Sequence, residues 1–355
     1  MDERQPLPLR RVPEHHCRGR GRREGGAAVR NFGYTVARTP SDAVRIASGT
    51  PNSAFVAGGT DLLNLMRDGA QAHDHLVDLN HLDLGRIDMD GTTLRVGALA
   101  RMRQVAEHPV VRREFPVLSQ ALLASASPQV RTMAAIGGNL LQRTRCGYFR
   151  DTGSGCNKRV PGSGCPAIGG HNRGHAILGG SDHCIATHPS DLAVALTALD
   201  ATVHLLGPDG ARTVPIADFY LLPGVTPDRE TVLRQGELIT RVDVPRTGAA
   251  TRSRYLKLRD RATFEFAVVS VAATLGMGGR TVRDVRLAFG GVGTRPWRDT
   301  RVEAALRGRE LTTATMTAAG RALVSDAVAR DGNGFKVELV QRALVSVLTE
   351  LGGVR

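Results

Sequence analysis

The sequence predicts an α+β protein built in three parts, and its order of patterns and its composition support this. Strand and helix patterns alternate up to residue 85, paired strands and apolar helices follow to about residue 248, and strands followed by helices fill the remainder. Apolar residues make up 41% of the 355 residues, which is enough for several hydrophobic cores. No apolar run approaches the roughly 18–20 residues of a membrane-spanning helix. We therefore expect a multidomain chain without a membrane span.

Residues 1–28 differ from the rest of the chain. They hold seven arginines, four acidic residues and almost no apolar periodicity, a composition typical of disorder. No apolar segment follows the Arg-Arg pair, so we expect no signal peptide. We interpret 1–28 as a disordered or mis-assigned extension, with translation from Val29 as the second explanation.

Residues 29–85 are expected to form a small α/β unit. The stretch "SDAVRIAS" is typical of a short amphipathic helix, with Ser41 or Asp42 as its cap. "AFVAGGTDLLNLMRDGA" predicts a strand, a glycine turn and a helix, and "HLVDLN" predicts a second strand.

Residues 86–248 are expected to form a second unit of hairpins and helices. "GRIDMDGTTLRVGALA" predicts a hairpin that turns at Asp90-Gly91. Helical patterns follow in "MRQVAEHP" and "REFPVLSQALLAS", and "SDLAVALTALDA" predicts a helix that Ser190 caps. A second hairpin turns near Pro208-Asp209-Gly210, and "GELITRVDVP" predicts the closing strand.

Residues 249–355 are expected to form an antiparallel sheet followed by helices. "RYLKLRDRATFEFAVVSVAATL" and "TVRDVRLAFGGVG" have the apolar and β-branched content of strands. "VEAALRG", "MTAAGRALVSDAVA" and "KVELVQRALVSVLTEL" have the 3.6-residue period of helices.

The formal net charge of +13 raises the question of a nucleic-acid partner. The basic residues are spread along the chain, and aromatic residues that could stack on bases make up only 4% of it. We expect no nucleic-acid partner.

Two glycine segments are candidates for ligand loops. Gly58-Gly59-Thr60-Asp61 lies between a strand and a helix, where backbone N–H groups can approach an anion. It is neither the dinucleotide fingerprint nor a P-loop. "AAIGGNLLQ", residues 134–142, places two glycines beside Asn139. Taken alone, either segment is more often an ordinary tight turn than a ligand loop.

A long basic loop carries four cysteines separated by nine, eight and eighteen residues. The close cysteine pairs of structural zinc sites are absent. Eight glycines between Gly147 and Gly174 would allow the loop to wrap an iron–sulfur cluster. Residues 143–173 hold six basic residues against one aspartate, a balance that suits a negatively charged group. From spacing alone, a cluster, a zinc ion and unligated thiols all stay open. The cysteines are Cys146, Cys156, Cys165 and Cys184.

Together, "FVAGGTDLL", "AAIGGNLLQ", "THPSDLAVAL" and "RYLKLRDRATFEFAVVSVA" resemble the FAD-binding subunit of the xanthine dehydrogenase family of molybdenum hydroxylases. The cysteine loop is similar to that of the aldehyde oxidoreductase flavin subunits that carry an extra [4Fe-4S] cluster. The resemblance covers about residues 31–352. It implies an α/β FAD-binding domain of two subdomains (PCMH-type, residues 29–85 and 86–248, with the iron–sulfur loop at 143–187), a C-terminal flavoprotein domain at 249–355, and one cluster on the four cysteines.

The resemblance also implies an FAD site. The first glycine segment of the chain would hold the pyrophosphate of FAD. Ser190 and Asp191 would form hydrogen bonds with ribityl or ribose hydroxyls. Ile239 would lie on a strand beside the flavin ring. Lys257 would lie near the polar edge of that ring and stabilise negative charge there. The other residues that the resemblance assigns to FAD are Ala54, Phe55, Val56, Ala57, Gly58, Gly59, Thr60, Asp61, Leu62, Ala135, Gly138 and Asn139.

The implied activity is electron transfer. A large subunit with the molybdenum cofactor would hydroxylate the substrate, a small subunit with two [2Fe-2S] clusters would relay electrons, and this chain would release them through FAD. No triad or paired-carboxylate pattern demands other chemistry, so we expect no catalytic residue here. A stand-alone flavin oxidase of the vanillyl-alcohol type and a zinc-bearing interaction protein are the alternatives. We expect a periplasmic location by export with a signal-bearing partner, or a cytoplasmic one.

Overall fold

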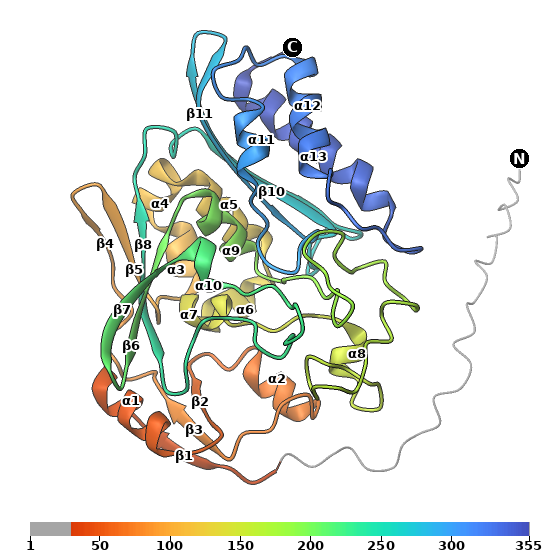
Figure 1. Ribbon diagram of the computed structural model, residues 1–355. Coiled ribbons are helices and arrows are strands. Elements are labelled where there is room, and N and C mark those ends of the chain that lie inside the picture. The colour runs from red at the N-terminus through yellow and green to blue at the C-terminus, as the bar shows by residue number, and fades with distance from the viewer. Residues whose placement is uncertain (1–29, 355) are drawn as a thin grey trace, which may run out of the picture.

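The computed structural model describes residues 30–354 and confirms the α+β class (Figure 1). The expectations for residues 1–28, and Cys17 among them, lie outside the described residues. Within 30–354, no helix combines the length and the apolar character that crossing a membrane requires.

The N-terminal unit is a three-stranded parallel sheet in the order β1-β3-β2. The expected strand, glycine turn and helix are confirmed as β2 and α2. The cap expected at Ser41 or Asp42 is wrong, because the hydroxyl of Thr39 accepts the Asp42 N–H at 3.0 Å and the helix begins at Pro40. The elements are β1 (Gly33–Val36), α1 (Pro40–Gly49), β2 (Ser53–Val56), α2 (Leu62–Arg67) and β3 (His75–Asp78).

The second unit contains a five-stranded antiparallel sheet in the order β4-β5-β8-β6-β7. Both expected hairpins are present, and the expected closing strand, β8, lies between them. The chain therefore leaves the sheet after β5 and returns at β6, and the intervening segment carries the second glycine segment and the cysteine loop. The strands are β4 (Ile87–Asp90), β5 (Thr93–Gly97), β6 (Thr202–Gly207), β7 (Gly210–Pro215) and β8 (Leu238–Pro245).

Eight helices accompany this sheet, and several of them were not expected. Proline starts α4, α5 and α6, which fits its preference for the first helical position. The Ser190 cap is confirmed, because its hydroxyl accepts the Ala193 N–H at 3.0 Å. The helices are α3 (Met102–Glu107), α4 (Pro109–Glu114), α5 (Pro116–Ala124), α6 (Pro128–Met133), α7 (Ile136–Leu140), α8 (Gly147–Arg150), α9 (Asp191–Ala198) and α10 (Ile216–Phe219).

The C-terminal unit is an antiparallel sheet, β11-β10-β9, buried on both faces. Val269, Val271 and Ala273 belong to the core shared with the last helices, whereas Ala272 belongs to the core that contains α5 and α9. Burial on both faces explains the nearly continuous apolar run of β10. The elements are β9 (Ser253–Leu258), β10 (Val269–Gly278), β11 (Thr281–Gly290), α11 (Thr300–Ala304), α12 (Thr313–Leu323) and α13 (Phe335–Gly352).

The cysteine loop, yellow-green in Figure 1, lies beside both α2 and the C-terminal sheet. Its beginning bonds to Asp61 just before α2, and its later part bonds to Lys336 on α13. The boundaries between units at 85/86 and 248/249 stay a prediction.

Candidate cofactor cleft and cysteine cavity

A cleft of about 510 Å³ opens between the two glycine segments, the N-terminus of α9 and the segment that joins β9 to β10. Its volume lies within the range of about 300–1,000 Å³ common for small-molecule sites. It gathers most of the residues that the sequence assigned to FAD. These are Ala54, Phe55, Val56, Ala57, Gly58, Gly59, Thr60, Asp61, Leu62, Ala135, Gly138, Asn139, Asp191 and Lys257.

The first glycine segment needs its glycines for two different reasons. Gly59 has a φ of +66°, in the left-handed region that side chains other than glycine rarely adopt. A Cβ on Gly58 would lie 2.0 Å from the carbonyl oxygen of Met133, at the end of α6. The turn is therefore packed directly against the second unit of the fold, and Gly58 is required for that packing.

The second glycine segment forms α7. A Cβ on Gly137 would contact Ala98 at 3.1 Å, whereas a Cβ on Gly138 would have no heavy atom within 4 Å. Asn139 is buried, and its Oδ1 accepts a hydrogen bond from the Ser190 hydroxyl at 2.7 Å. Ser190 therefore joins the second glycine segment to α9, and it does not line the cleft itself.

A buried ion pair lies at the side of the cleft where α9 meets β9. Lys257 Nζ is 2.8 Å from Asp191 Oδ2, which also accepts from the Ser125 hydroxyl at 2.9 Å. Tyr255 donates to Asp191 Oδ1 at 2.5 Å, and burial together with the Asp191 charge raises the pKa of Tyr255 well above its usual range. Tyr255 and Lys257 reach the same carboxylate because alternate residues of a strand share a face.

Ile239 does not line the cleft. It lies on β8, paired with Leu205 of β6, and is 3% exposed within the main core. A β-branched residue in the central strand of a buried sheet needs no ligand to account for it.

Sequence reasoning missed several residues that line the cleft. Arg145 stacks over the Phe266 ring at 4.8 Å and forms an ion pair with Asp61. The only available signal was the run of arginines at the start of the cysteine loop, which spacing alone does not connect to the glycine turn. Other lining residues are His73, Gln142, Arg143, Phe264 and Glu265.

Asp61 links the glycine turn to the cysteine loop. Besides Arg145, its carboxylate accepts from the Arg143 backbone N–H at 2.8 Å and from Arg150 Nη2 at 3.0 Å. Because Asp61 is engaged with three residues of the loop, the cleft and the cysteine loop are mechanically connected.

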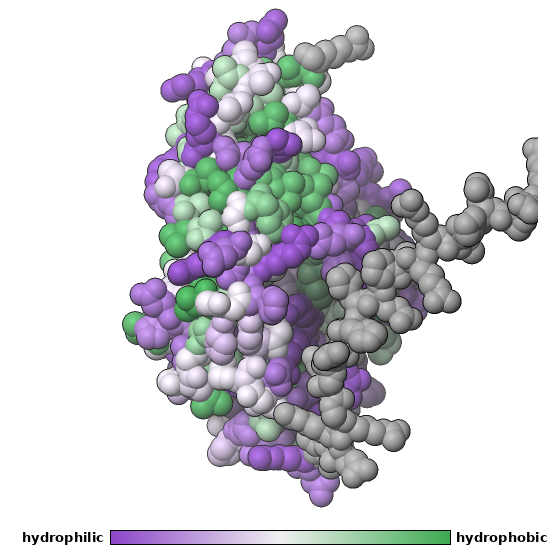
Figure 2. Space-filling model, turned by 90° about the vertical axis from the view of Figure 1, so that its right-hand side faces the viewer, coloured by the Kyte–Doolittle hydropathy of each residue, from purple (hydrophilic) through white to green (hydrophobic). Residues whose placement is uncertain are grey.

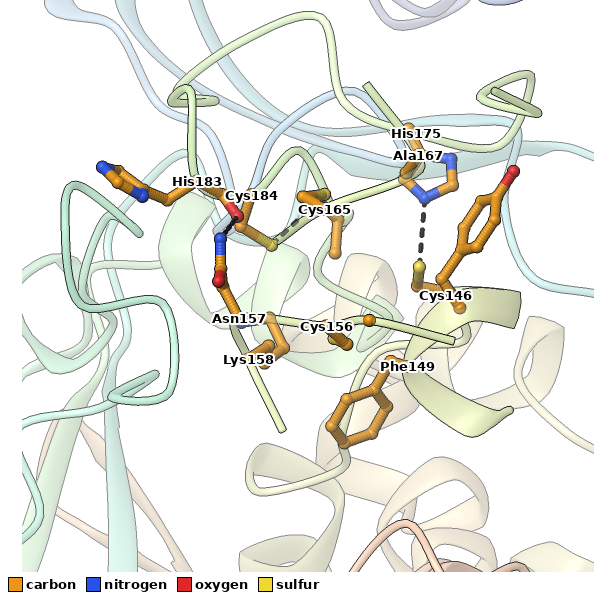
Figure 3. Close-up of a pocket in the computed structure, with 13 residues that line it drawn as sticks. Cys146, Phe149, Cys156, Asn157, Lys158, Cys165, Ala167, His175, His183 and Cys184 are labelled. Atoms are coloured by element: carbon orange, nitrogen blue, oxygen red, sulfur yellow. Dashed lines mark hydrogen bonds between the residues drawn. The ribbon is translucent and has the colours of Figure 1, made fainter. Parts of the chain in front are cut away.

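All four cysteines of the loop surround one small cavity (Figure 3). Cys156 and Cys184 are buried, and Cys146 and Cys165 are partly buried. His175 Nε2 lies 3.2 Å from Cys146 Sγ, as the dashed line in Figure 3 shows. Residues separated by up to 38 positions in the sequence thus present their thiols to a common space.

The environment of the thiols combines burial with backbone donors. Burial raises the pKa of Cys146 to about 11, and hydrogen bonds from the backbone of Phe149 and Tyr148 act in the opposite direction. Burial likewise raises the pKa of Cys184, although Lys158 and the backbone of Ala186 oppose it. Buried thiols with backbone amides directed at their sulfurs fit thiolate ligands of an iron–sulfur cluster.

The spacing of the side chains bears on the zinc alternative. Among the described residues, no three His, Cys, Asp or Glu side chains converge closely enough to hold a single metal ion. A cluster of four irons requires its thiolates farther apart than one zinc ion does, because each thiolate binds a different iron.

We expect Gly138→Leu to exclude a cofactor from the cleft while the fold survives. The new side chain would extend into open space at the cleft wall rather than into packed protein. The flavin-to-protein ratio of the purified variant should fall severalfold, with an unchanged circular dichroism spectrum.

The matched control is Gly49→Leu, at the exposed end of α1, where a Cβ also has no neighbour within 4 Å. It should retain the parental flavin content. Full flavin occupancy in Gly138→Leu would show that the cofactor does not use this wall of the cleft.

The chain belongs to the FAD-binding subunits of the molybdenum hydroxylases. Residues 30–247 match the family described as the FAD binding domain in molybdopterin dehydrogenase, and residues 254–351 match the CO dehydrogenase flavoprotein C-terminal domain. It is thus the flavin subunit of an oxidoreductase, and the FAD expected from the sequence is confirmed at the level of the family.

Individual relatives agree with this. The aldehyde oxidoreductase FAD-binding subunit PaoB of Escherichia coli K12 is 46% identical over 91% of this chain and 98% of its own. The glyceraldehyde dehydrogenase medium chain of Sulfolobus acidocaldarius is 27% identical over 79% of this chain and 82% of its own. A chain of carbon monoxide dehydrogenase from Hydrogenophaga pseudoflava shares the fold, with a TM-score of 0.71 at 24% identity, over 90% of this chain and 96% of that one.

Proposed function

We propose that this chain is the FAD- and [4Fe-4S]-binding electron-transfer subunit of a heterotrimeric molybdenum-dependent aldehyde oxidoreductase. It passes electrons from the [2Fe-2S] clusters of a small subunit to an external acceptor, while a large molybdenum subunit oxidises the aldehyde. The observation that carries the proposal is the single cavity bounded by four cysteines next to the cofactor cleft. The 46% identity to a subunit named for aldehyde oxidoreductase supports the substrate class.

FAD occupies the cleft in this proposal. When bound, it supplies the exchange of one or two electrons at a time. The Gly58-Gly59 turn places backbone near the pyrophosphate, because a side chain would prevent close approach. Arg145, held by Asp61, adds positive charge at the same cleft. Lys257, in its ion pair with Asp191, lies at the wall of the cleft, where its ammonium group would balance charge gained by the flavin.

The four cysteines hold the cluster in this proposal. The cluster supplies one-electron transfer when bound, and the chain supplies four thiolates, backbone donors and basic neighbours. Lys158 is one such neighbour, 2.7 Å from Glu230, and its charge opposes the rise that burial causes in the pKa of Cys184. Asp61 then joins the cluster loop to the flavin turn, which keeps the two redox sites in a fixed relation.

The partners are expected to cover part of the surface. Figure 2 shows apolar side chains gathered in the upper half of one face, above a band of hydrophilic ones. Val328, between α12 and α13, and Phe335, the first residue of α13, are among the exposed apolar residues of the C-terminal unit. Apolar patches of this kind are typical of subunit interfaces. Export of the folded complex on a partner's signal would place it in the periplasm, and a complex without that signal would stay in the cytoplasm.

Assembly with the two partner subunits tests the proposed role. The full complex should reduce an artificial electron acceptor with an aldehyde as donor, and omission of this chain should lower that turnover to near background. The partners alone should still be reduced by the aldehyde in a single turnover. Equal turnover with and without this chain would contradict an electron-transfer role.

A further inference from the structure

The later part of the cysteine loop is anchored by two polar residues at the start of α13. Asn333 and Lys336 are fully buried. Lys336 Nζ donates to the carbonyl oxygens of His175 at 3.0 Å and Gly291 at 2.6 Å, and Asn333 Nδ2 donates to the carbonyl of Ala176 at 3.1 Å. These contacts fix the backbone of His175 relative to the C-terminal sheet.

His175 is in turn aimed at a cysteine of the cavity. Its Nε2 lies 3.2 Å from Cys146 Sγ, and the residue is 7% exposed. Within the described residues, its Nδ1 is buried without a hydrogen-bond partner. A metal-bound thiolate only accepts hydrogen bonds, so the ring proton belongs on Nε2.

Lys336 is an unusual cation because its Nζ contacts carbonyl groups instead of a carboxylate. Among residues 30–354, no carboxylate lies within ion-pair distance of it, and burial lowers its pKa to about 7. The charge of Arg173 lowers the pKa of Lys336 further, and the charge of Asp260 raises it. Arg173 and Asp260 form an ion pair with each other at 2.8 Å, so neither serves as the partner of Lys336. A buried cation is costly without a counter-charge. A bound cluster with its four thiolates would supply the opposite charge that keeps Lys336 protonated.

We propose that His175 and Lys336 are positioning residues that raise the reduction potential of the iron–sulfur centre. His175 donates a hydrogen bond to the Cys146 thiolate, and Lys336 both holds His175 in place and supplies a positive charge behind it. The inference rests on the proposed function, since it requires the [4Fe-4S] cluster.

The physical reason is that reduction adds one electron, and one negative charge, to the centre. A hydrogen bond to a ligand sulfur and a nearby cation both stabilise the more negative state, so both raise the potential. No proton needs to move in this step, and no bond to iron is made or broken.

The test is a redox titration of the cluster, followed by electron paramagnetic resonance, in the full-length protein. His175→Phe keeps a planar ring but loses the N–H donor, and its midpoint potential should fall. His175→Gln can still donate from its amide and should recover part of the shift. Lys336→Gln keeps donors for the two carbonyls but removes the charge, and its midpoint potential should also fall.

The matched control is His171→Phe, an exposed histidine of the same loop, which should leave the midpoint potential unchanged. Unchanged potentials in His175→Phe and Lys336→Gln, with full iron content, would overturn the inference and leave the cluster intact. Loss of the cluster in both His175→Phe and His175→Gln would also overturn it, because it would make His175 a folding residue of the loop. A parent protein without acid-labile sulfide would instead refute the cluster itself.

Discussion

Replacing Cys184 by serine should remove most of the iron and acid-labile sulfide from the purified protein. Cys184 is 5% exposed and borders the same cavity as the other three cysteines, so no alternative thiol of the described chain is placed to substitute for it. A [4Fe-4S] cluster has one thiolate for each iron, and a serine hydroxyl is a poor replacement. The same loss is expected for serine at Cys146, Cys156 and Cys165.

The loss should extend beyond the metal. The loop lacks long regular elements, and the cluster would cross-link it at four positions and offset the entropy of ordering it. Protease should therefore cleave the variant near the exposed segment that contains Val160, which is 54% exposed. Cys17→Ser is the matched control and should keep parental iron and sulfide. Full iron and sulfide in Cys184→Ser would show that this cysteine is not a ligand.

Lys257→Met should destabilise the protein by about 3 kcal/mol and lower its flavin content. The substitution leaves the carboxylate of Asp191 buried with only the hydroxyls of Ser125 and Tyr255 as donors. Breaking a buried ion pair on one side is costly because the remaining charge has lost its partner. Denaturant unfolding of the flavin-free protein measures the change in the free energy of unfolding separately from the loss of cofactor.

Two further variants make this result interpretable. The double variant Asp191→Asn/Lys257→Met removes both charges and should recover part of the lost stability. Arg261→Met removes an exposed arginine paired with Glu265 and should change stability little. A Lys257→Met protein as stable as its parent would show that the pair contributes nothing to the folded state.

Local sequence patterns predicted many of the helices and hairpins. The β6–β7 hairpin followed from its Pro-Asp-Gly turn, and α9 from its serine cap, because such signals act within a few residues. Short helices such as α6 and α8 escaped prediction because four to six residues are too few to establish a period. The cap of α1 was misplaced by two positions because threonine, serine and aspartate, all good caps, occur close together.

The site was less accessible to sequence reasoning than the fold. The glycine segments and Asp191 were recognisable through family resemblance, but the contacts of Asp61 with a loop more than 80 residues away were not. Lys336 shows the same limit, since a lysine in a helical pattern predicts a solvated residue and this one is completely buried. Both contacts depend on how the three units pack together, which no local pattern encodes.

The most direct test of the proposed function is the cofactor content of the full-length protein purified without oxygen. Flavin, iron and acid-labile sulfide should be measured on one sample, together with the electron paramagnetic resonance spectrum after reduction. We predict about one FAD, about four irons and about four sulfides per chain, with the signal of a reduced [4Fe-4S] cluster. Stoichiometric zinc, or flavin without acid-labile sulfide, would contradict it.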